Sequence, residues 1–578
     1  MQNYQQIFVI YFTLLFAQTS FGQFAFQDIS ATVGTMEQGG QNIGISFCDY
    51  NNDNLEDFYV VYRTGPNHFY KNQGNGVFTE IAQELGLNFR GNSRTAVWGD
   101  LNNDGFEDVY IGNMNEADVL YFNNGDDTFT DITAIAGIEN DSRVFSANMV
   151  DVNQDGWLDI YVSNSNSDNV LYLNNGEKNP SFTNYTTAAG LKDTRHCMGV
   201  VFFDMDNDGD EDLYVTHDAN IPNTLYQNDG TGHFTEMGQA AGVAYRGFGM
   251  GVDAGDLDND GLLDLYVTNL YANVLYINQG DGTFLDFTDI SKVGDVGMGW
   301  GASIFDFDND GLNDIYVGND SYFYPLPNLL YENKGNYKFS SMDTAAVVSS
   351  MQGTYGVATG DLNNDGIQDL ALANIGSKDN TQILKNELDA GYWIGFKLTG
   401  TESNHSAIGT RIEIRDNRGD LHVDQVTAGN GYAGQNSKRI HFGFGNVAAI
   451  KSIKIIWPSG LVQEIDGLDL GQYYSVVEGQ TPTVLAFGMT TSAPEILAND
   501  FDISVFPNPT SRFLRVDLPA DLRSGVSVRM VNSVGQVVYH RVNFQGPQLE
   551  IDLDRLTGSF EVLIEGDGVL VGRRVLVF

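Results

Sequence analysis

Positive charge is scarce in this sequence: 30 Lys and Arg stand against 76 Asp and Glu, for a formal net charge of −46. Such a surface disfavours nucleic acid and anionic membranes as partners. No stretch after residue 22 is apolar for long enough to span a bilayer, so membrane insertion is not expected. The two cysteines, Cys48 and Cys197, belong to different repeats, and we expect free buried thiols rather than a disulfide.

The common catalytic patterns are also missing. There is no Gly-x-Ser-x-Gly elbow, no His-Glu-x-x-His and no reactive-cysteine arrangement, and the eight histidines are scattered. We therefore predict no catalytic residues and no enzymatic activity. A carboxylate pair assembled from distant loops stays open as an alternative.

What the sequence does have is a recurring acidic loop, clearest at Asp306–Asp314, which reads D-x-D-x-D-G-x-x-D. Oxygen side chains occupy positions 1, 3, 5 and 9, and a glycine at position 6 permits a tight turn that points them inward. Carboxylates this close repel one another unless a hard cation neutralises them. Ca²⁺ suits them because it accepts six to eight oxygen ligands in a flexible shell.

The loop occurs seven times at intervals of 50 to 55 residues, which predicts about seven structural Ca²⁺ ions. Position 7 would contribute its backbone carbonyl. The predicted ligands are Asp49, Asn51, Asp53, Leu55, Asp57; Asp100, Asn102, Asp104, Phe106, Asp108; Asp151, Asn153, Asp155, Trp157, Asp159; Asp204, Asp206, Asp208, Asp210, Asp212; Asp256, Asp258, Asp260, Leu262, Asp264; Asp306, Asp308, Asp310, Leu312, Asp314; and Asp361, Asn363, Asp365, Ile367, Asp369.

Two other interpretations of the loops were weighed. An EF-hand needs Glu at position 12 and flanking helices, whereas position 12 here is apolar and strand-like segments follow. A set of metal-free Asx turns remains the structural alternative. If calcium binds, the fourth to sixth loops should bind most tightly, because they carry four carboxylates and the others three.

Each repeat contains four short strand-like pieces, and four strands repeated at about 50 residues are typical of a β-propeller blade. The seventh repeat lacks its Phe-x-Asp strand, and Phe26-Gln-Asp28 supplies that pattern near the N-terminus. We predict an all-β protein with a seven-bladed β-propeller, in which residues 24–30 form the outer strand of the last blade and close the ring.

Residues 24–387 thus resemble the FG-GAP/VCBS-type calcium-loop propellers. The segments Ser403–Arg411, Gly429–Gln435, His441–Gly445 and Trp457–Gly460 resemble the ASPIC/UnbV domain of the cartilage acidic protein family, for which no biochemical activity is agreed. Residues from Ile503 onward are similar to the C-terminal sorting domain of type IX secretion, a small β-sandwich. That resemblance implies export through the type IX secretion machinery and a secreted or cell-surface location.

The resulting domain prediction is a signal peptide over 1–22, the propeller over 23–388, an ASPIC/UnbV-like β-domain over 389–478, a linker over 479–502 and the sorting domain over 503–578. The signal peptide rests on an apolar core from Ile7 to Ala17 and small residues at a cleavage site near Gly22.

Although basic residues are few, several precede the predicted inner strands, at the ends opposite the acidic loops. With two aromatic residues at matching positions, they predict a ligand site at the mouth of the propeller channel: Arg90, Arg94, Arg143, Arg195, His196, Arg246, Trp300 and Tyr355. The structural alternative is that these arginines only pair with nearby carboxylates.

We expect a monomeric, non-catalytic binding or adhesion module for a glycan or a protein at the cell surface. A polysaccharide-degrading lyase or hydrolase on the same scaffold is the alternative.

Overall fold

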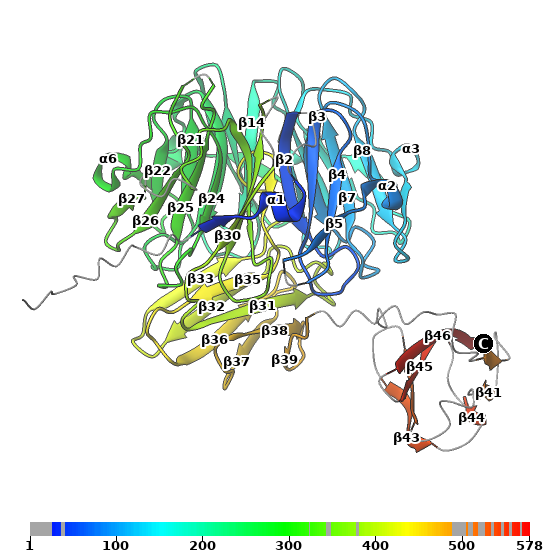
Figure 1. Ribbon diagram of the computed structural model, residues 1–578. Coiled ribbons are helices and arrows are strands. Elements are labelled where there is room, and N and C mark those ends of the chain that lie inside the picture. The colour runs from blue at the N-terminus through cyan, green and yellow to red at the C-terminus, as the bar shows by residue number, and fades with distance from the viewer. Residues whose placement is uncertain are drawn as a thin grey trace, which may run out of the picture. The chain divides into compact units, whose positions relative to one another are not determined.

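The computed structural model describes residues 26–35, 41–74, 76–322, 324–342, 348–376 and 381–487, and in the C-terminal part 504–506, 513–517, 526–532, 537–544, 548–553, 558–566 and 569–577. The chain divides into two compact units, Met1–Leu485 and Ala486–Phe578 (Figure 1). The predicted signal peptide and residues 488–502 of the predicted linker lie outside the described residues.

The first unit opens with sheets of four antiparallel strands, one for each acidic loop, and in the first sheet β34 (Gly434–Gln435) adds a fifth, parallel strand. Their strands, innermost first, are β2 (Gln41–Cys48), β3 (Asp57–Thr64), β4 (His68–Asn72), β5 (Phe78–Glu80); β6 (Ser93–Gly99), β7 (Asp108–Asn113), β8 (Val119–Asn123), β9 (Phe129–Asp131); β10 (Val144–Val150), β11 (Asp159–Asn164), β12 (Val170–Asn174), β13 (Phe182–Asn184); β14 (Cys197–Phe203), β15 (Asp212–His217), β17 (Thr224–Asn228), β18 (Phe234–Glu236); β20 (Gly249–Gly255), β21 (Asp264–Asn269), β22 (Val274–Asn278), β23 (Phe284–Asp286); β24 (Gly299–Phe305), β25 (Asp314–Asn319), β26 (Leu329–Asn333), β27 (Phe339–Ser341); and β28 (Thr354–Gly360), β29 (Asp369–Asn374), β30 (Gln382–Asn386), β1 (Phe26–Asp28).

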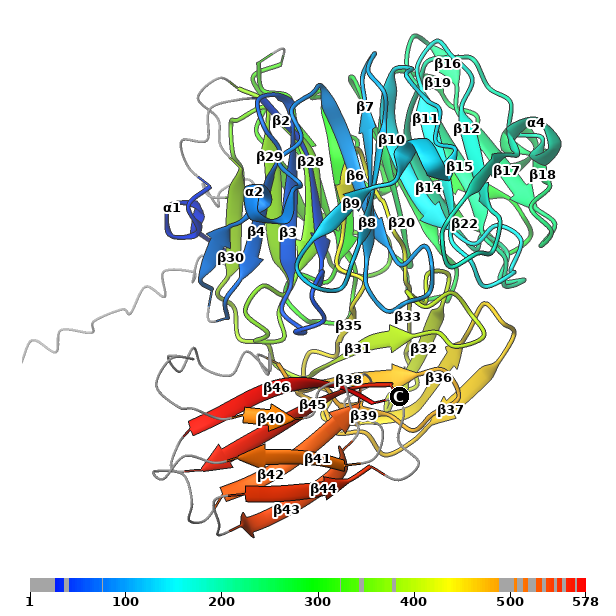
Figure 2. The ribbon, with the colours of Figure 1, turned by 90° about the vertical axis from the view of Figure 1, so that its right-hand side faces the viewer.

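The inner strands contact one another in a closed cycle, from β2 through β6, β10, β14, β20, β24 and β28 back to β2. The sheets stand side by side around this cycle (Figures 1 and 2), an arrangement typical of a β-propeller. A short ribbon of β16 (Ile221–Pro222) and β19 (Arg246–Gly247) links two neighbouring sheets.

The predicted closure is confirmed for the described residues. β1 pairs antiparallel with β30, with Phe26 opposite Asn386 and Asp28 opposite Leu384. A strand from the N-terminal end therefore completes the last sheet, which would otherwise lack its outer strand.

One-turn helices follow most of the outer strands. They are α1 (Ser30–Val33), α2 (Ala82–Leu85), α3 (Thr133–Ala136), α4 (Thr186–Ala189), α5 (Gly238–Ala241) and α6 (Thr288–Ser291). The polar residue that ends each outer strand caps its helix, as where Asp131 Oδ1 accepts from the Thr133 amide at 3.0 Å. Among the described residues no helix has the length and apolar character needed to cross a membrane.

The rest of the first unit is a β-domain of two four-stranded sheets. Its strands are β31 (Trp393–Thr399), β32 (Arg411–Asp416), β33 (Leu421–Gln425), β35 (Ile440–Gly443), β36 (Ile450–Ile456), β37 (Val462–Ile465), β38 (Gln472–Val477) and β39 (Thr483–Val484). Because β39 pairs with β38, this domain continues into residues that the sequence analysis assigned to a linker. One apolar core joins it to the propeller, with Met149 and Leu158 on one side and Ile408 and Trp457 on the other.

The second unit contains two antiparallel sheets. One consists of β40 (Ser504–Phe506), β41 (Phe513–Asp517) and β44 (Gln548–Asp552), and the other of β43 (Val537–Phe544), β42 (Val526–Asn532), β45 (Gly558–Gly566) and β46 (Val569–Val577).

Candidate calcium loops and the arginine face

The fourth loop illustrates how the sequence shapes each acidic turn. Asp204 accepts hydrogen bonds from the Asp208 amide through Oδ1 at 3.2 Å and from the Gly209 amide through Oδ2 at 3.0 Å. Gly209 has a φ of 93°, where a side chain would be strained. The first loop has Asn54 at this position with a φ of 64°, as expected for the residue that best replaces glycine there.

The aspartate at position 9 ties the acidic loop to two strands of its sheet. Asp212 is fully buried at the start of β15, and it accepts from the Met205 amide at 3.0 Å and from the Asn228 amide at 2.8 Å. The position-9 carboxylate thus fixes the loop to the third strand of its own sheet, whatever else it binds.

Several loops bring their carboxylates close enough to share one ion. Carboxylate oxygens of three aspartates lie within 4.8 Å of one another in the fourth, fifth and sixth loops. The clusters are Asp204, Asp206 and Asp212; Asp256, Asp258 and Asp260; and Asp306, Asp308 and Asp314. These are the loops with a fourth carboxylate at position 3, where the others have asparagine.

The loop oxygens fit a hard divalent cation. In the fourth loop, Asp206 Oδ1 and Asp210 Oδ1 are buried without a hydrogen-bond partner. In the third loop Asn153 Nδ2 donates to Asp155 Oδ2 at 3.0 Å, and this leaves Asn153 Oδ1 buried and unpaired. Oxygen ligands are those that Ca²⁺ prefers, and such an ion would satisfy these atoms.

Burial also changes the acidity of these groups. Loss of solvation raises the pKa of Asp204 to about 6, that of Asp210 to about 7 and that of Asp212 to about 9. Neighbouring loop carboxylates add to the shift of all three pKa values. The loops are therefore costly to ionise unless a cation is bound.

A ring of asparagines at the ends of the third strands was not recognised in the sequence as a structural feature. Asn228 Nδ2 donates to the Glu211 carbonyl of its own sheet at 3.2 Å and to the Val152 carbonyl of the preceding loop at 2.9 Å. Asn72 closes the cycle, because it donates to the Leu362 carbonyl of the last loop at 2.8 Å. The equivalent donors are Asn72, Asn123, Asn174, Asn228, Asn278, Asn333 and Asn386.

The sequence did contain a signal for this ring, because asparagine recurs at the end of the third strand in every repeat. The acceptors of these asparagines could not be predicted from the sequence, because each hydrogen bond to the preceding loop joins residues that lie about 75 positions apart or more.

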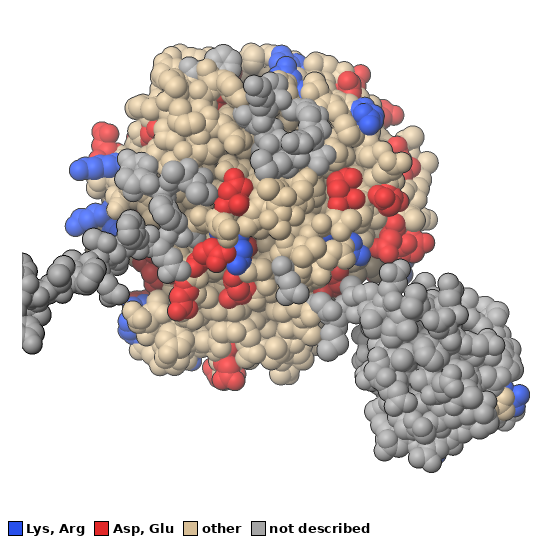
Figure 3. Space-filling model, viewed as in Figure 1, with Lys and Arg blue, Asp and Glu red and all other residues tan. Residues whose placement is uncertain are grey.

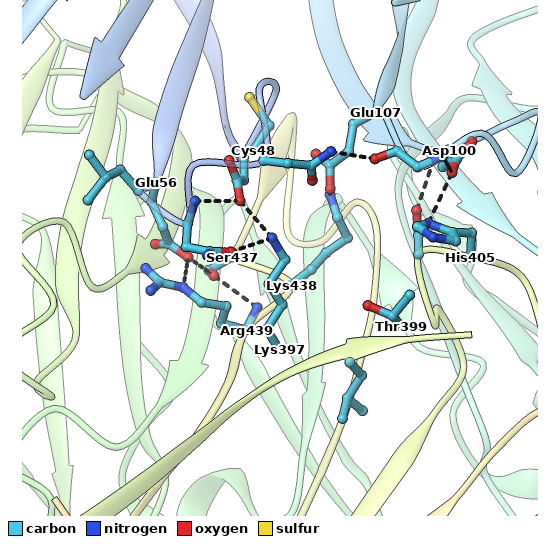
Figure 4. A pocket seen from close by; sticks show the side chains of 17 residues that line it. Cys48, Glu56, Asp100, Glu107, Lys397, Thr399, His405, Ser437, Lys438 and Arg439 are labelled. Carbon is cyan, nitrogen blue, oxygen red and sulfur yellow. Dashed lines mark hydrogen bonds and ion pairs between the residues drawn. The ribbon is translucent and has the colours of Figure 1, made fainter. Parts of the chain in front are cut away.

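The β-domain covers the loop end of the propeller. Lys397 Nζ donates to Asp49 Oδ2 at 2.7 Å, His405 Nδ1 lies 3.1 Å from Asp100 Oδ2, and Tyr473 Oη donates to Asp361 Oδ2 at 2.9 Å. Figure 4 shows the side chains that line a cavity of about 90 Å³ between the first two loops and this domain.

In that cavity, the basic groups that Figure 4 places opposite the loop carboxylates are already paired. Lys438 contacts Glu107 at 2.9 Å, and Arg439 contacts Glu56 at 2.7 Å. The domain therefore docks onto the loop face through charged contacts that include position-1 loop residues.

The β-domain also fills the propeller axis. Residues 429–435 run along the inner strands, where β34 (Gly434–Gln435) adds to β2 and Gly431 bridges to Val252. A Cβ on Gly431 would lie 2.7 Å from the Ala302 carbonyl oxygen, so only glycine fits. Tyr432 is completely buried at the axis, and the sequence analysis had no basis for placing it there.

The residues of the predicted ligand site lie at the opposite ends of the inner strands, on a surface that we call the arginine face. Arg143, for example, precedes β10, whereas Asp151 follows it. Arg90, Arg143 and Arg246 are exposed. Figure 3 shows one flank of the molecule, where acidic side chains are scattered and basic ones are sparse.

The structure brings three of the predicted residues together around Tyr432. The rings of Trp300 and Tyr355 stack at a centroid distance of 4.1 Å, and Trp300 lies 4.7 Å from the Tyr432 ring. The Arg94 guanidinium lies 5.6 Å from the centroid of Phe145. Met114, Phe145, Trp300, Tyr355 and Tyr432 belong to one apolar cluster.

Arg94 differs from the other predicted arginines because it is only 5% exposed, and it makes no ion pair within the described part of the chain. Its Nη2 lies 2.7 Å from Met114 Sδ, and its Nε has no hydrogen-bond partner. Desolvation lowers the pKa of this guanidinium, and the nearby charges of Arg63 and Arg143 lower it further. Arg63, at the end of β3, was not among the predicted site residues, because it does not precede an inner strand.

Arg195 and His196 are placed differently. Arg195 donates to both carboxylate oxygens of Asp193, at 2.7 and 2.5 Å, as the structural alternative predicts. His196 Nδ1 lies 3.1 Å from Ser165 Oγ. Arg246 lies in β19 of the small ribbon and is exposed.

Comparison with protein families identifies the family to which this chain belongs. Six matches to the FG-GAP-like repeat, over residues 49–111, 100–162, 151–215, 204–267, 260–317 and 306–372, together span more than half of the chain. The chain belongs to the FG-GAP-like repeat family. It also carries an ASPIC and UnbV domain over residues 400–483 and a secretion system C-terminal sorting domain over residues 504–569.

The sorting domain implies interaction with the type IX secretion machinery and a secreted or cell-surface location. The chain is also similar to Cartilage acidic protein 1 of Xenopus tropicalis, with 25% identity over 77% of this chain and 73% of that protein.

Two solved structures are more distant. An Agrocybe aegerita lectin that recognises non-reducing terminal N-acetylglucosamine shares 18% identity at a TM-score of 0.36, covering 52% of this chain and 79% of the lectin. The rhamnogalacturonan lyase YesW shares 12% identity at a TM-score of 0.35, covering 60% of this chain and 72% of the lyase. At these TM-scores neither likeness supports an inference about function.

Proposed function

We propose that this secreted FG-GAP protein is a seven-bladed, calcium-loaded propeller that acts as a non-catalytic binding module. Calcium has a structural role in the loops, where its binding free energy adds to the stability of the fold. The ligand binds at the arginine face, because the ASPIC/UnbV domain already covers the loop face and fills the axis.

The observation that carries this proposal is the buried guanidinium of Arg94. Burying an unpaired charge costs several kcal/mol, and a side chain without a counter-ion normally avoids it. Arg94 Nε has no hydrogen-bond partner, and the guanidinium lies beside the Tyr432 hydroxyl of the axial cluster, in which Trp300 Nε1 is also without a partner. An anionic group of a ligand would supply the missing partner.

The surroundings favour an acidic glycan as that ligand. The exposed Arg63 and Arg143 add positive charge beside Arg94. The stacked Trp300 and Tyr355 are each only 7% exposed, so they form a buried floor beneath these charges. Tyr271, which is 51% exposed and packs edge-on against Phe248, offers an aromatic ring to the apolar face of a sugar.

The test is a glycan array with acidic and neutral polysaccharides, probed with the whole secreted protein in calcium. Acidic glycans should bind, and Arg94→Gln should weaken binding by about tenfold or more, the value of one charged hydrogen bond. Lys178→Gln is the matched control, because Lys178 is exposed on an outer loop away from this face.

Unchanged binding by a folded Arg94→Gln variant would contradict the site. Binding only to acidic surface proteins would replace the glycan by a protein ligand. A fall in polymer length during incubation would instead support the polysaccharide-degrading alternative.

A further inference from the structure

A second cluster of metal-binding side chains lies outside the acidic loops, in the sheet of β14 and β15. Asp193, Cys197 and His217 have ligand atoms within 4.8 Å of one another, and all three are buried. His217 Nε2 lies 3.0 Å from Asp193 Oδ2 and 3.5 Å from Cys197 Sγ. We propose that these residues form a binding site for a thiophilic transition-metal ion, with Zn²⁺ as the fitting example.

The spacing suits such an ion. Zn²⁺ binds sulfur at about 2.3 Å and imidazole nitrogen at about 2.0 Å, so tetrahedral ligands of these types lie about 3.5 Å apart. The observed separation of the sulfur and the nitrogen has this value. Ca²⁺ would bind poorly at this site, because thiolate and imidazole are ligands that prefer softer ions.

Neighbouring groups would support the ligands. Asn169 Nδ2 lies 3.3 Å from Cys197 Sγ and can donate to a thiolate. Arg195 holds the Asp193 carboxylate through two hydrogen bonds and so fixes its orientation. Such contacts around metal ligands orient them and tune their affinity.

The other repeats show what the fold requires at this place. Where β15 ends in His217, the equivalent strands end in Asn113, Asn164, Asn269, Asn319 and Asn374, or carry Tyr62. Asn319 donates to Asp295 at 2.6 Å, which is the same link as the one between His217 and Asp193. A polar pair is therefore sufficient for the propeller, whereas the combination of His217 with Cys197 occurs in this sheet alone among the repeats.

The metal-free network competes with this site. Asp193 is already neutralised by Arg195, and burial raises the pKa of the Cys197 thiol, so the ion must displace the thiol proton. Because the ligands are buried, the metal has to be present while the protein folds. Among the described residues no fourth side chain joins the cluster, which leaves one coordination position open.

The test uses the whole protein, produced in medium supplemented with Zn²⁺ or Co²⁺, then exchanged into excess Ca²⁺ so that the acidic loops hold calcium. We expect one equivalent of Zn²⁺ per chain by elemental analysis, and a sulfur-to-cobalt charge-transfer band for the cobalt form. Only a thiolate ligand can produce that band.

Two variants test individual ligands, and a third serves as the control. Cys197→Ser should abolish the band, and Cys48→Ser should keep it, because Cys48 is the other buried free cysteine. His217→Asn installs the residue of the other repeats, so it should fold while retaining less than about a tenth of the metal. Wild-type protein without stoichiometric zinc and without the band, or a band that depends on Cys48, would overturn the proposal. Neither outcome bears on glycan binding at Arg94.

Discussion

The two ends of the propeller are built from the same repeats but differ in regularity. At the loop end, the position-1, position-5 and position-9 aspartates and the asparagine ring recur in every repeat, and the ASPIC/UnbV domain covers this face. At the arginine end, matching positions hold Ile43, Arg94, Phe145, Met198, Met250, Trp300 and Tyr355, a different side chain in nearly every sheet.

This difference separates two kinds of constraint. A side chain that is needed to hold each sheet to the next must recur in every repeat, because every junction has the same geometry. A binding face has no such requirement, since one ligand needs different groups at different places. Regular positions are therefore expected to determine stability, and irregular ones recognition.

Removal of calcium should have the largest effect on the loop end. A structural ion at a hundredfold excess over its Kd adds about 2.7 kcal/mol, and several sites act together. Chelation should therefore lower the Tm of the first unit by roughly 10 °C or more, measured by calorimetry against the calcium-loaded protein.

Graded chelation sharpens this test. The loops with three carboxylates should lose calcium first, and the clusters at Asp204, Asp256 and Asp306 last, as followed by calcium titration. Equal loss from every loop would contradict the ranking, and an unchanged Tm would contradict a structural role for calcium.

Gly431→Ala tests the axial packing of the ASPIC/UnbV domain. The new Cβ would lie 2.7 Å from the Ala302 carbonyl oxygen and at a φ of 61°, so we expect a loss of about 3 kcal/mol in thermal unfolding. Gly419→Ala is the control, because it shares the positive φ and has no atom within 4 Å of the added Cβ. Equal losses in both variants would show that backbone strain alone is responsible.

Asn278→Ala tests the asparagine ring. It removes the donors to the Met205 carbonyl at 2.8 Å and to the Leu263 carbonyl at 3.1 Å, which would leave two buried acceptors unpaired. The expected cost is about 2 to 3 kcal/mol in denaturant unfolding. The neighbouring exposed Gln279→Ala should change stability by less than about 0.5 kcal/mol. A similar small change in both variants would mean that the ring does not hold the sheets together.

Much of this architecture could be predicted because it repeats. The strands, the turn glycines and the closing strand at Phe26–Asp28 follow from local patterns that recur every 50 to 55 residues. Pairing of Asp193 with Arg195 could be anticipated only as an alternative, since many carboxylates were available to each arginine.

The position of Tyr432 could not be predicted. It belongs to a different domain, and its segment Gly429–Gln435 was recognised only through its resemblance to the ASPIC/UnbV domain, which does not place it along the propeller axis. The glycines are explained only by the carbonyl oxygens that face them, such as that of Ala147 at 2.5 Å from a Cβ on Gly429. The same long-range placement explains why Arg94 is the one arginine of the predicted ligand site that is buried.

The smallest expected effect is on the pH dependence of folding stability, which should have opposite signs with and without bound calcium. Without metal, burial raises the pKa of Asp204 to about 6 and those of Asp151 and Asp256 to about 7, above the value of about 4 in an unfolded chain. The folded protein then binds more protons than the unfolded chain between about pH 4 and 7, so its stability falls as pH rises through this window. Bound calcium requires ionised carboxylates, and its contribution to stability therefore grows with pH.

The gap in Tm between calcium-loaded and metal-depleted protein should accordingly widen from pH 5 to pH 8. Depletion is done beforehand by dialysis, because chelators themselves lose affinity in acid. A gap of constant size would mean that the loop aspartates stay ionised without metal. The absence of any gap, at every pH tested, would instead favour metal-free Asx turns over calcium sites at the loop end of the propeller.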